Sequence, residues 1–190
     1  MRRVMKALIL TAAVAAITAP AQARAEGYVS PWAGVNFGNN DRVSNGRASF
    51  GVNAGGMGAG IIGGEVGFGY SPSFFGTTND FGNNTVIDFM GNVIVGVPIG
   101  GTHGAGLRPF VTGGLGLIRT QIDGGTFAKV QSSNNDLGWN AGAGVMGYFN
   151  DHVGLRGDLR YFRNIQGNVI NNIDFGNFHY WRGSIGVVIR

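Results

Sequence analysis

The feature that most constrains the fold of this chain is an alternation of apolar residues with polar or small ones, with a period of two. It recurs in eight segments that are separated by stretches rich in Gly, Asn, Asp and Ser. Glycine recurs throughout, and each one costs about 1 kcal/mol in the interior of a helix. The sequence therefore predicts an all-β fold. The expected strands are Tyr28–Phe37, Arg47–Gly56, Ile61–Tyr70, Thr85–Val97, Leu107–Gln121, Leu137–Phe149, Val153–Arg163 and Phe178–Arg190.

The connections between these segments alternate in length. Long ones follow the first, third, fifth and seventh segments, tight ones follow the second and sixth, and the fourth connection is intermediate. Short turns at one end and long loops at the other are typical of an outer-membrane β-barrel, and an even number of strands agrees with it. The pattern predicts an eight-stranded antiparallel up-and-down transmembrane β-barrel.

The two faces of each segment differ in kind. In Val153–Arg163 the odd positions are apolar or glycine up to Tyr161, whereas the even positions include Arg156, Asp158 and Arg160. A soluble β-sandwich with its charges in water shows the same alternation, so this rival stays open at this step. Glycine crowded beside the charges favours a narrow barrel interior instead.

The stretch "IIGGEVGFGY" from Ile61 to Tyr70 places one carboxylate, Glu65, among glycine and large apolar residues. In a barrel of eight strands the interior is just wide enough to be filled by side chains, and Glu65 faces that interior. An unpaired buried charge is strongly destabilising, so acids and bases on the inner face are expected to pair. We expect Glu65 to pair with Arg108 or Arg156, and Asp88 with Arg160 or Arg182. The expected charge network of the lumen is Glu65, Asp88, Arg108, Arg156, Asp158, Arg160 and Arg182.

Aromatic residues on the apolar faces fall near the long-loop end of their strands. They are Tyr70, Trp139, Tyr161 and Trp181, and they are expected to form a girdle at a membrane interface. At the short-turn end Phe149 is the clearest candidate for the second girdle.

The first 25 residues have the three regions of a signal peptide. A basic start, "MRRVMK", precedes an apolar run from Ala7 to Ala19, which is short for a membrane anchor, and two small-x-small cleavage frames follow Pro20. The expected domains are a signal peptide over residues 1–25 and a barrel over residues 26–190. The net charge of +4 disappears on cleavage after Ala25, because four basic residues leave and ten basic residues then face ten acidic ones. The mature domain therefore lacks the excess of positive charge that binding to nucleic acid requires.

Four stretches resemble the small outer-membrane β-barrel proteins of the OmpA/OmpX type: "FGVNAGGMGAGIIGGEVGFGYSP" from Phe50, "LRPFVTGGLGL" from Leu107, "NAGAGVMGYFNDHVGLRGDLRYFR" from Asn140, and "GSIGVVIR" from Gly183. The resemblance implies location in the outer membrane of a diderm bacterium, contact with its lipid and lipopolysaccharide, and insertion by the barrel-assembly machinery. It is specific for the architecture and not for an activity. Members usually end in an aromatic residue, whereas this sequence ends in Ile189 and Arg190.

Motifs for catalysis or cofactors are weak. Two G-x-G-x-x-G matches, from Gly58 and Gly142, lack the strand, helix and acidic residue that a nucleotide site needs. The histidines 103, 152 and 179 are too scattered for a metal site, cysteine is absent, and His179 and Ser184 differ in parity. We expect no enzyme activity, no cofactor and no metal.

The expected function is a structural role in envelope integrity, exerted by a monomer. The sequence does not exclude that the barrel also contains a narrow pore. The alternative is a surface adhesin or binding module that acts through the extracellular loops. Phe74 and Phe75, in the second long loop, are the candidate contact residues, although packing of these side chains against the barrel rim is an equal alternative.

Overall fold

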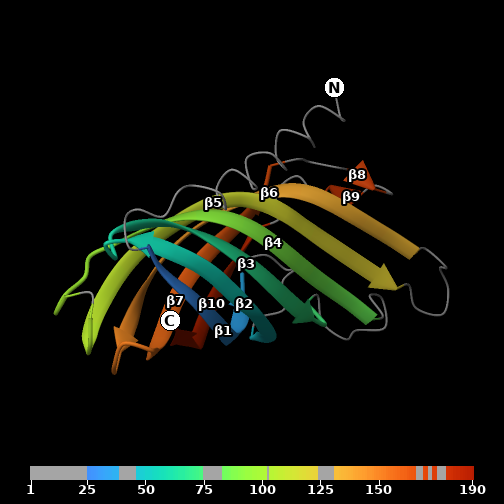
Figure 1. Cartoon of the computed structure of the whole chain (residues 1–190). Helices are drawn as coiled ribbons and strands as arrows, with labels where there is room; N and C mark the ends of the chain where they lie inside the picture. Colours follow the sequence, from blue (N-terminus) through green and yellow to red (C-terminus); the bar gives the residue numbers. More distant parts are fainter. Residues whose placement is uncertain are drawn as a thin grey trace.

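The computed structural model describes residues 25–38, 46–74, 83–101, 103–123, 131–165, 169–170, 173–174 and 179–190. These residues form a closed antiparallel barrel, as the alternation predicts (Figure 1). The barrel strands are β1 (Ala25–Phe37), β2 (Arg47–Gly58), β3 (Ile62–Pro72), β4 (Asn83–Gly96), β5 (Gly106–Asp123), β6 (Gln131–Tyr148), β7 (Val153–Asn164) and β10 (His179–Ile189). None of the described residues forms a helix long and apolar enough to cross a membrane. The expected signal peptide lies outside the described residues apart from Ala25, which begins β1.

Each strand pairs with its neighbours in the chain, and β1 closes the ring against β10, in the order β1-β10-β7-β6-β5-β4-β3-β2. The paired positions lead once around the ring from β1 and return to β1 ten residues further on. The path runs through Gly27, Gly56, Gly64, Val93, Gly113, Ala141, Tyr161, Trp181 and Phe37. With ordinary strand spacings this stagger tilts the strands by about 40° from the barrel axis.

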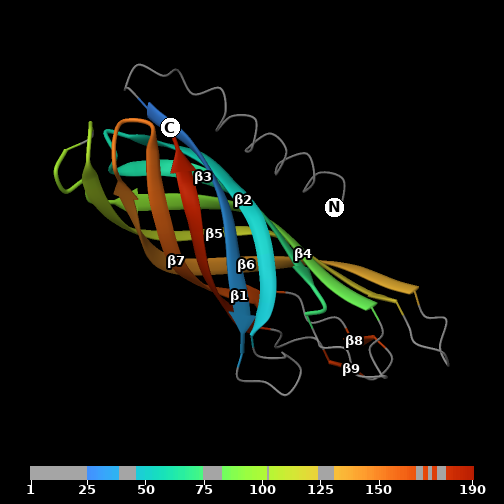
Figure 2. The same cartoon turned by 90° about the horizontal axis from the view of Figure 1, so that it is seen from below.

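The two ends of the barrel differ. Residues 59–61, 97–105 and 149–152 connect strands at the end where β10 also finishes, which we call the short-turn end. The longer connections lie at the opposite, long-loop end, and the last of them contains the two-stranded sheet of β8 (Val169–Ile170) and β9 (Ile173–Asp174). Figure 2 shows the C-terminus and this small sheet at opposite ends of the barrel.

The turn between β2 and β3 shows why glycine is needed at this end. Ala59 and Gly60 both have positive φ angles, 49° and 69°, and Ile61 N–H donates to the Gly58 carbonyl at 3.0 Å. This is the arrangement of a type I′ turn, whose twist matches that of the flanking strands. A side chain on Gly60 would also collide with the Arg108 guanidinium. The turn therefore packs directly against an interior charge.

Strands β5 and β6 are longer than the sequence predicts. Their ladder continues to the pair Asp123 and Gln131, beyond the expected ends at Gln121 and Leu137. The additional residues of β6 begin with Gln131–Asn135, which are polar throughout and lack the apolar alternation by which the strand was placed. A ladder needs only backbone hydrogen bonds, so pairing continues where the alternation stops.

Burial follows the expected parity. In β7 exposed and buried positions alternate almost without interruption, and the exposed ones include the apolar Val153, Leu155 and Leu159. In β3 the exposed Val66 and Phe68 flank interior positions in the same way. The outer surface is apolar and the interior holds the charges, the reverse of a soluble sandwich.

Candidate functional site: the barrel interior

All seven residues of the expected charge network lie inside the barrel. Glu65 comes from β3, Asp88 from β4, Arg108 from β5, three residues from β7 and Arg182 from β10. Each is buried, and Glu65 retains only 3% of its surface. Alternation places these side chains inward, because each sits at a position whose two neighbours face outward.

The middle of the lumen holds a four-charge cluster of Glu65, Arg156, Asp158 and Arg160. Glu65 accepts hydrogen bonds from Arg156 Nη1 and from Arg160 Nη2, the latter at 2.8 Å. Asp158 accepts from Arg156 Nε at 2.8 Å and from Arg160 Nη2 at 3.3 Å. Two carboxylates and two guanidinium groups thus neutralise one another inside the barrel.

Neutral hydroxyl groups complete this cluster. Tyr28 donates to Glu65 Oε2 at 2.7 Å, and Ser184 Oγ donates to Asp158 Oδ1 at 2.8 Å. The carboxylates therefore have partners beyond the two arginines, as buried charges require. The network ties β1, β3, β7 and β10 together.

The second ion pair lies nearer the long-loop end. Arg182 binds Asp88 through two parallel hydrogen bonds of 2.6 and 3.1 Å, the bidentate geometry that suits a guanidinium. Arg182 Nε donates to Asn36 Oδ1 at 3.0 Å. Its guanidinium carbon lies 4.6 Å from the ring centroid of Phe162 and 5.0 Å from that of Trp32. The pair is held by its hydrogen bonds and by the aromatic faces beside it.

The third ion pair was not expected from the sequence. Arg108 does not contact Glu65 but donates to Glu26 Oε2 at 2.9 Å. Arg190 lies 3.4 Å from the same oxygen and stacks over Tyr148. Glu26 was missed because the first strand was expected to begin at Tyr28. Extending the alternation by two residues places it on the inner face.

These three ion pairs share one geometry. Glu26 and Arg108 belong to β1 and β5, Glu65 and Arg156 to β3 and β7, and Asp88 and Arg182 to β4 and β10. In the ring order each pair of strands lies four places apart among eight, so the two strands are on opposite walls. Each ion pair therefore crosses the full width of the lumen.

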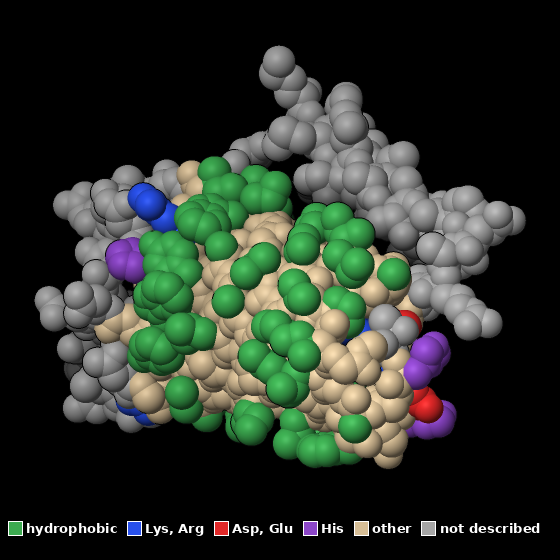
Figure 3. Space-filling model, turned by 90° about the vertical axis from the view of Figure 1, so that its left-hand side faces the viewer, with side chains coloured by type: hydrophobic (Ala, Val, Ile, Leu, Met, Phe, Trp, Pro, Cys, Tyr) green, Lys and Arg blue, Asp and Glu red, His purple; other side chains and the backbone are tan. Residues whose placement is uncertain are grey.

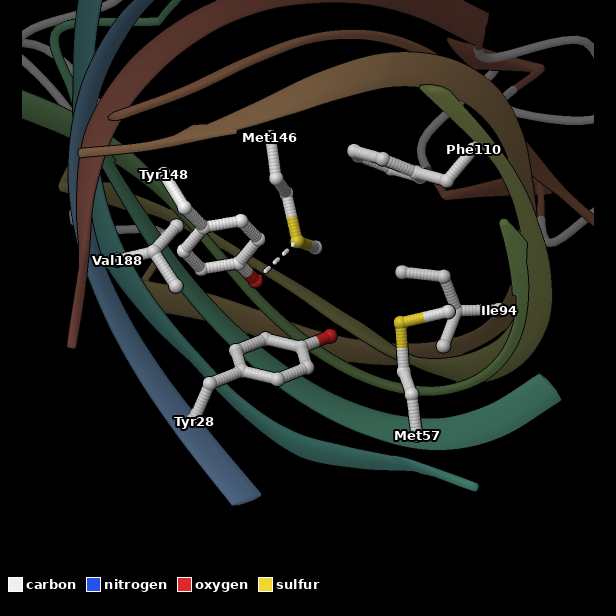
Figure 4. Packing of buried hydrophobic residues seen from close by; sticks show 7 residues of the cluster. All are labelled: Tyr28, Met57, Ile94, Phe110, Met146, Tyr148 and Val188. Carbon is white, nitrogen blue, oxygen red and sulfur yellow. Dashed lines mark hydrogen bonds between the residues drawn. The ribbon is translucent and has the colours of Figure 1, made fainter. Parts of the chain in front are cut away.

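Apolar side chains fill the interior on both sides of the four-charge cluster. At the short-turn end the cluster consists of Tyr28, Met57, Ile94, Phe110, Met146, Tyr148 and Val188 (Figure 4). At the long-loop end it consists of Phe74, Val86, Met90, Ile118, Phe162 and Tyr180. A cavity between Trp32, Asp88, Arg160 and Arg182 has a volume of only about 10 Å³, roughly that of one water molecule.

The sequence matches the family model of the outer membrane protein beta-barrel domain over residues 9–186. This match covers most of the chain. The chain belongs to this outer-membrane β-barrel family. Its location is therefore the outer membrane. No curated protein matches the sequence significantly.

Solved structures of small outer-membrane barrels resemble this barrel. Neisserial surface protein A is 18% identical, with a TM-score of 0.66 over 87% of this chain and 97% of that one. The N-terminal barrel of Pseudomonas aeruginosa OprF is 16% identical, with a TM-score of 0.51 over 87% and 98%. A major outer membrane protein of Thermus thermophilus is 13% identical, with a TM-score of 0.52 over 86% and 99%. At such identities the likeness shows the fold alone.

The outer surface of this outer-membrane barrel carries the expected aromatic residues on its lipid side. Trp139, Tyr161 and Trp181, from β6, β7 and β10, form a continuous row, with ring centroids 5.5 Å apart for the first pair and 5.2 Å for the second. Tyr70 lies on β3 and is paired in register with the exposed Phe50 of β2. Figure 3 shows hydrophobic side chains across the middle of one face, with charged ones near its ends.

The expectation that Phe74 is an exposed loop contact is wrong. Its side chain is fully buried and packs edge-on against Tyr180, with centroids 4.9 Å apart. Ser73, with a positive φ of 50°, donates its N–H to the Asn84 carbonyl at 2.7 Å, and this turn places Phe74 inside the barrel. The alternative, that Phe74 packs against the barrel, is the one that its burial and its contact with Tyr180 support. Phe75 lies outside the described residues.

The histidines of this outer-membrane barrel lie apart from the lumen. His103 and His152 are in short turns, where His103 is 3.7 Å from Asp151. His179 contacts Tyr161 on the outer wall, whereas Ser184 binds Asp158 inside. Within the described part of the chain, no group of three or more His, Cys, Asp or Glu residues is placed to hold a metal ion.

Proposed function

We propose that this protein is a non-conducting and non-enzymatic barrel with a structural role in the integrity of the outer membrane. The observation that carries the proposal is the set of three ion pairs that cross the lumen between opposite strands. A solute path along the axis has to pass all three. Each pair is hydrogen-bonded, and its side chains are buried apart from that of Glu26, which is 16% exposed. Separating a pair therefore leaves two uncompensated charges, which is strongly unfavourable.

The packing between the ion pairs supports the same proposal. Fully buried Met57, Met146 and Ile94 lie on the short-turn side of the four-charge cluster, and Phe74, Ile118 and Tyr180 lie on its long-loop side. An ion that passed along the lumen would therefore have to leave water and cross both apolar clusters. This arrangement disfavours the alternative of a narrow pore.

The alternative of a loop-mediated adhesin loses one of its two supporting residues, since Phe74 packs inside the barrel. No described residue favours a particular loop ligand, so the structural role is the better supported one. We further propose that the protein works as a monomer, in contact with the lipid and lipopolysaccharide of the outer membrane, and is inserted by the barrel-assembly machinery. Exposed apolar side chains such as Val29, Phe89 and Leu155 lie on strands around the ring, as lipid contact on all sides requires.

Single-channel recording in a planar bilayer tests the proposal. The wild-type protein is expected to give no regular current steps, while its gel mobility shifts on boiling and so reports a folded barrel. The double variant Asp88→Ser/Arg182→Ser, which keeps the net charge, removes one of the three pairs and is expected to give no current either, because the other two pairs and both apolar clusters remain. Regular steps from the folded wild-type protein would overturn the proposal and return the protein to the class of pores.

A further inference from the structure

We propose that the outer wall of β6, β7 and β10 binds the phosphorylated sugar head group of an outer-leaflet glycolipid. The site consists of Arg163 and His179 beside the aromatic residues Trp139, Tyr161 and Trp181. It deepens the structural role by naming a lipid partner. It rests on the location in the outer membrane and not on a closed lumen, so a conducting barrel would leave it standing.

The position of Arg163 places its charge at the height of lipid head groups. Arg163 follows Tyr161 by two residues in the direction of the long loops and has the same outward parity. At strand spacing and the tilt of this barrel, two residues rise by roughly 5 Å. Aromatic girdles mark the boundary of the hydrocarbon region, and the head-group layer beyond it is about 5–7 Å thick. The backbone of Arg163 therefore lies within the head-group layer, and its guanidinium can reach the head groups from there.

The neighbours of Arg163 make a platform that suits a phosphorylated sugar. In the ladder Arg163 is paired with Trp139 of β6 on one side and with His179 of β10 on the other. The Tyr161 ring lies 5.8 Å from His179 and 5.2 Å from Trp181. A guanidinium matches the geometry of a phosphate bidentately, and amphipathic aromatic rings sit at the head-group level. Charge and stacking surface thus meet on three adjacent strands.

The charges of the outer surface are arranged asymmetrically. Among the arginines whose side chains are described, Arg119 and Arg163 are the exposed ones, and both lie in the half of the barrel toward the long loops. Among the described acidic side chains, Asp151 is the exposed one, and it lies in a short turn at the other end. Among the described side chains, the exposed positive charge thus lies toward the long-loop end, which faces the outer leaflet.

Arg119 provides a matched control. It is an exposed, outward-facing arginine on β5, but its partner on β6 is Asn135, four residues beyond Trp139. It therefore has the charge of Arg163 without the aromatic row. If binding depends on the assembled platform, Arg163 and Arg119 differ in effect, whereas a diffuse attraction between charges treats them alike.

The test uses the protein purified from outer membranes in detergent, with tryptophan fluorescence as the readout, since two of the three tryptophans lie in the proposed site. The probes are bisphosphorylated lipid A, its dephosphorylated form, and phosphatidylglycerol. We expect saturable binding of the first probe and at least about tenfold weaker binding of the other two. The dephosphorylated form loses the charge-assisted hydrogen bonds to Arg163, and phosphatidylglycerol keeps a phosphate but has no sugar to lie on the aromatic rings. Arg163→Ala is expected to weaken lipid A binding by about tenfold, Arg163→Lys to weaken it less, and Arg119→Ala to leave it unchanged.

Three results would overturn the inference. They are equal binding by the wild-type protein and Arg163→Ala, equal binding of lipid A and phosphatidylglycerol, and an equal loss in Arg119→Ala. The Arg163 variants are expected to fold, because the side chain is exposed, and the gel shift on boiling checks this. Planar-bilayer conductance tests the closed lumen separately, so the failure of one proposal can be told from that of the other.

Discussion

Glu65 on β3 and Arg156 on β7 meet across the centre of the barrel, joined by a hydrogen bond from Arg156 Nη1 to Glu65 Oε2. The residues are 91 positions apart in the sequence, and their strands stand on opposite walls of the ring. Arg160 donates to the other oxygen of Glu65. Glu65 and Asp158 are thus the two acids that share the same two buried arginines.

Replacing Glu65 by Gln is expected to destabilise the barrel by about 3–5 kcal/mol, because both arginines then share only Asp158 as a carboxylate partner. Urea unfolding, followed by the loss of the gel shift on boiling, measures the effect. Asp151→Asn, at an exposed acid in a short turn, is the control and is expected to change stability by less than about 0.5 kcal/mol. A midpoint for Glu65→Gln equal to that of the control would show that the pairing is energetically idle.

A double-mutant cycle on Asp88 and Arg182 is expected to show coupling. Asp88→Asn and Arg182→Gln each leave one buried charge without its bidentate partner, whereas the double variant leaves neither. The loss in the double variant is therefore expected to be smaller than the sum of the single losses, by about 0.5–3 kcal/mol. Pairing Asp88→Asn with Glu26→Gln, which is bonded to another arginine, supplies the additive reference. Additivity in both cycles would contradict the observed geometry.

Phe74→Ala is expected to cost about 3–5 kcal/mol in unfolding free energy, because it removes a fully buried ring from the cluster around Tyr180. Phe149→Ala, at a 65% exposed side chain near the short-turn end, is the matched control. The comparison is made by urea unfolding in the same detergent. If the two variants lost equal stability, Phe74 would be a surface residue, as the loop-contact alternative from the sequence has it.

Two glycines of opposite parity give a prediction about the lumen. A methyl group on Gly69 would collide with the Asp88 carboxylate and with Arg182, whereas the nearest atom to one on Gly157 would be 4.0 Å away. Gly69→Ala is expected to destabilise the barrel by about 1–3 kcal/mol. Gly157→Ala is expected to be neutral within about 0.5 kcal/mol. Thermal unfolding of the two variants under the same conditions measures this difference in stability. If Gly157→Ala were the less stable variant, the inner and outer faces of these strands would be assigned wrongly.

The sequence predicts the architecture well because one pattern determines both strand positions and faces. Successive side chains of a strand point to opposite faces. Because Asp88 is flanked by the apolar Ile87 and Phe89, which face the lipid, its own side chain has to face the lumen. The parity argument therefore places all seven charged residues on the inner face. Height along the barrel axis gives two candidate partners for each acid. Of these, the structure has Arg156 with Glu65, joined there by Arg160, and Arg182 with Asp88.

Parity cannot give the partner across the lumen, because that depends on the stagger of the whole ring. Arg108 was one of the two candidate partners of Glu65, but the stagger of the ring brings it to Glu26. Nor does alternation reach residues beyond the last strand position. Phe74 turns inward because Ser73 has a positive φ angle. Serine rarely adopts this conformation, so the residue types in this loop do not predict the turn.

The diametric ion pairs have a consequence for how the protein enters its membrane. Arg156, the partner of Glu65, follows it by 91 residues in the chain, and Arg182, the partner of Asp88, follows it by 94 residues. A half-built sheet in lipid would hold these carboxylates beside hydrocarbon with no counter-charge, at a cost of several kcal/mol each. Insertion one strand at a time is therefore unfavourable, because each carboxylate would enter the lipid before its arginine. Pairing across the lumen instead favours an insertion in which the ring closes as the strands enter the bilayer.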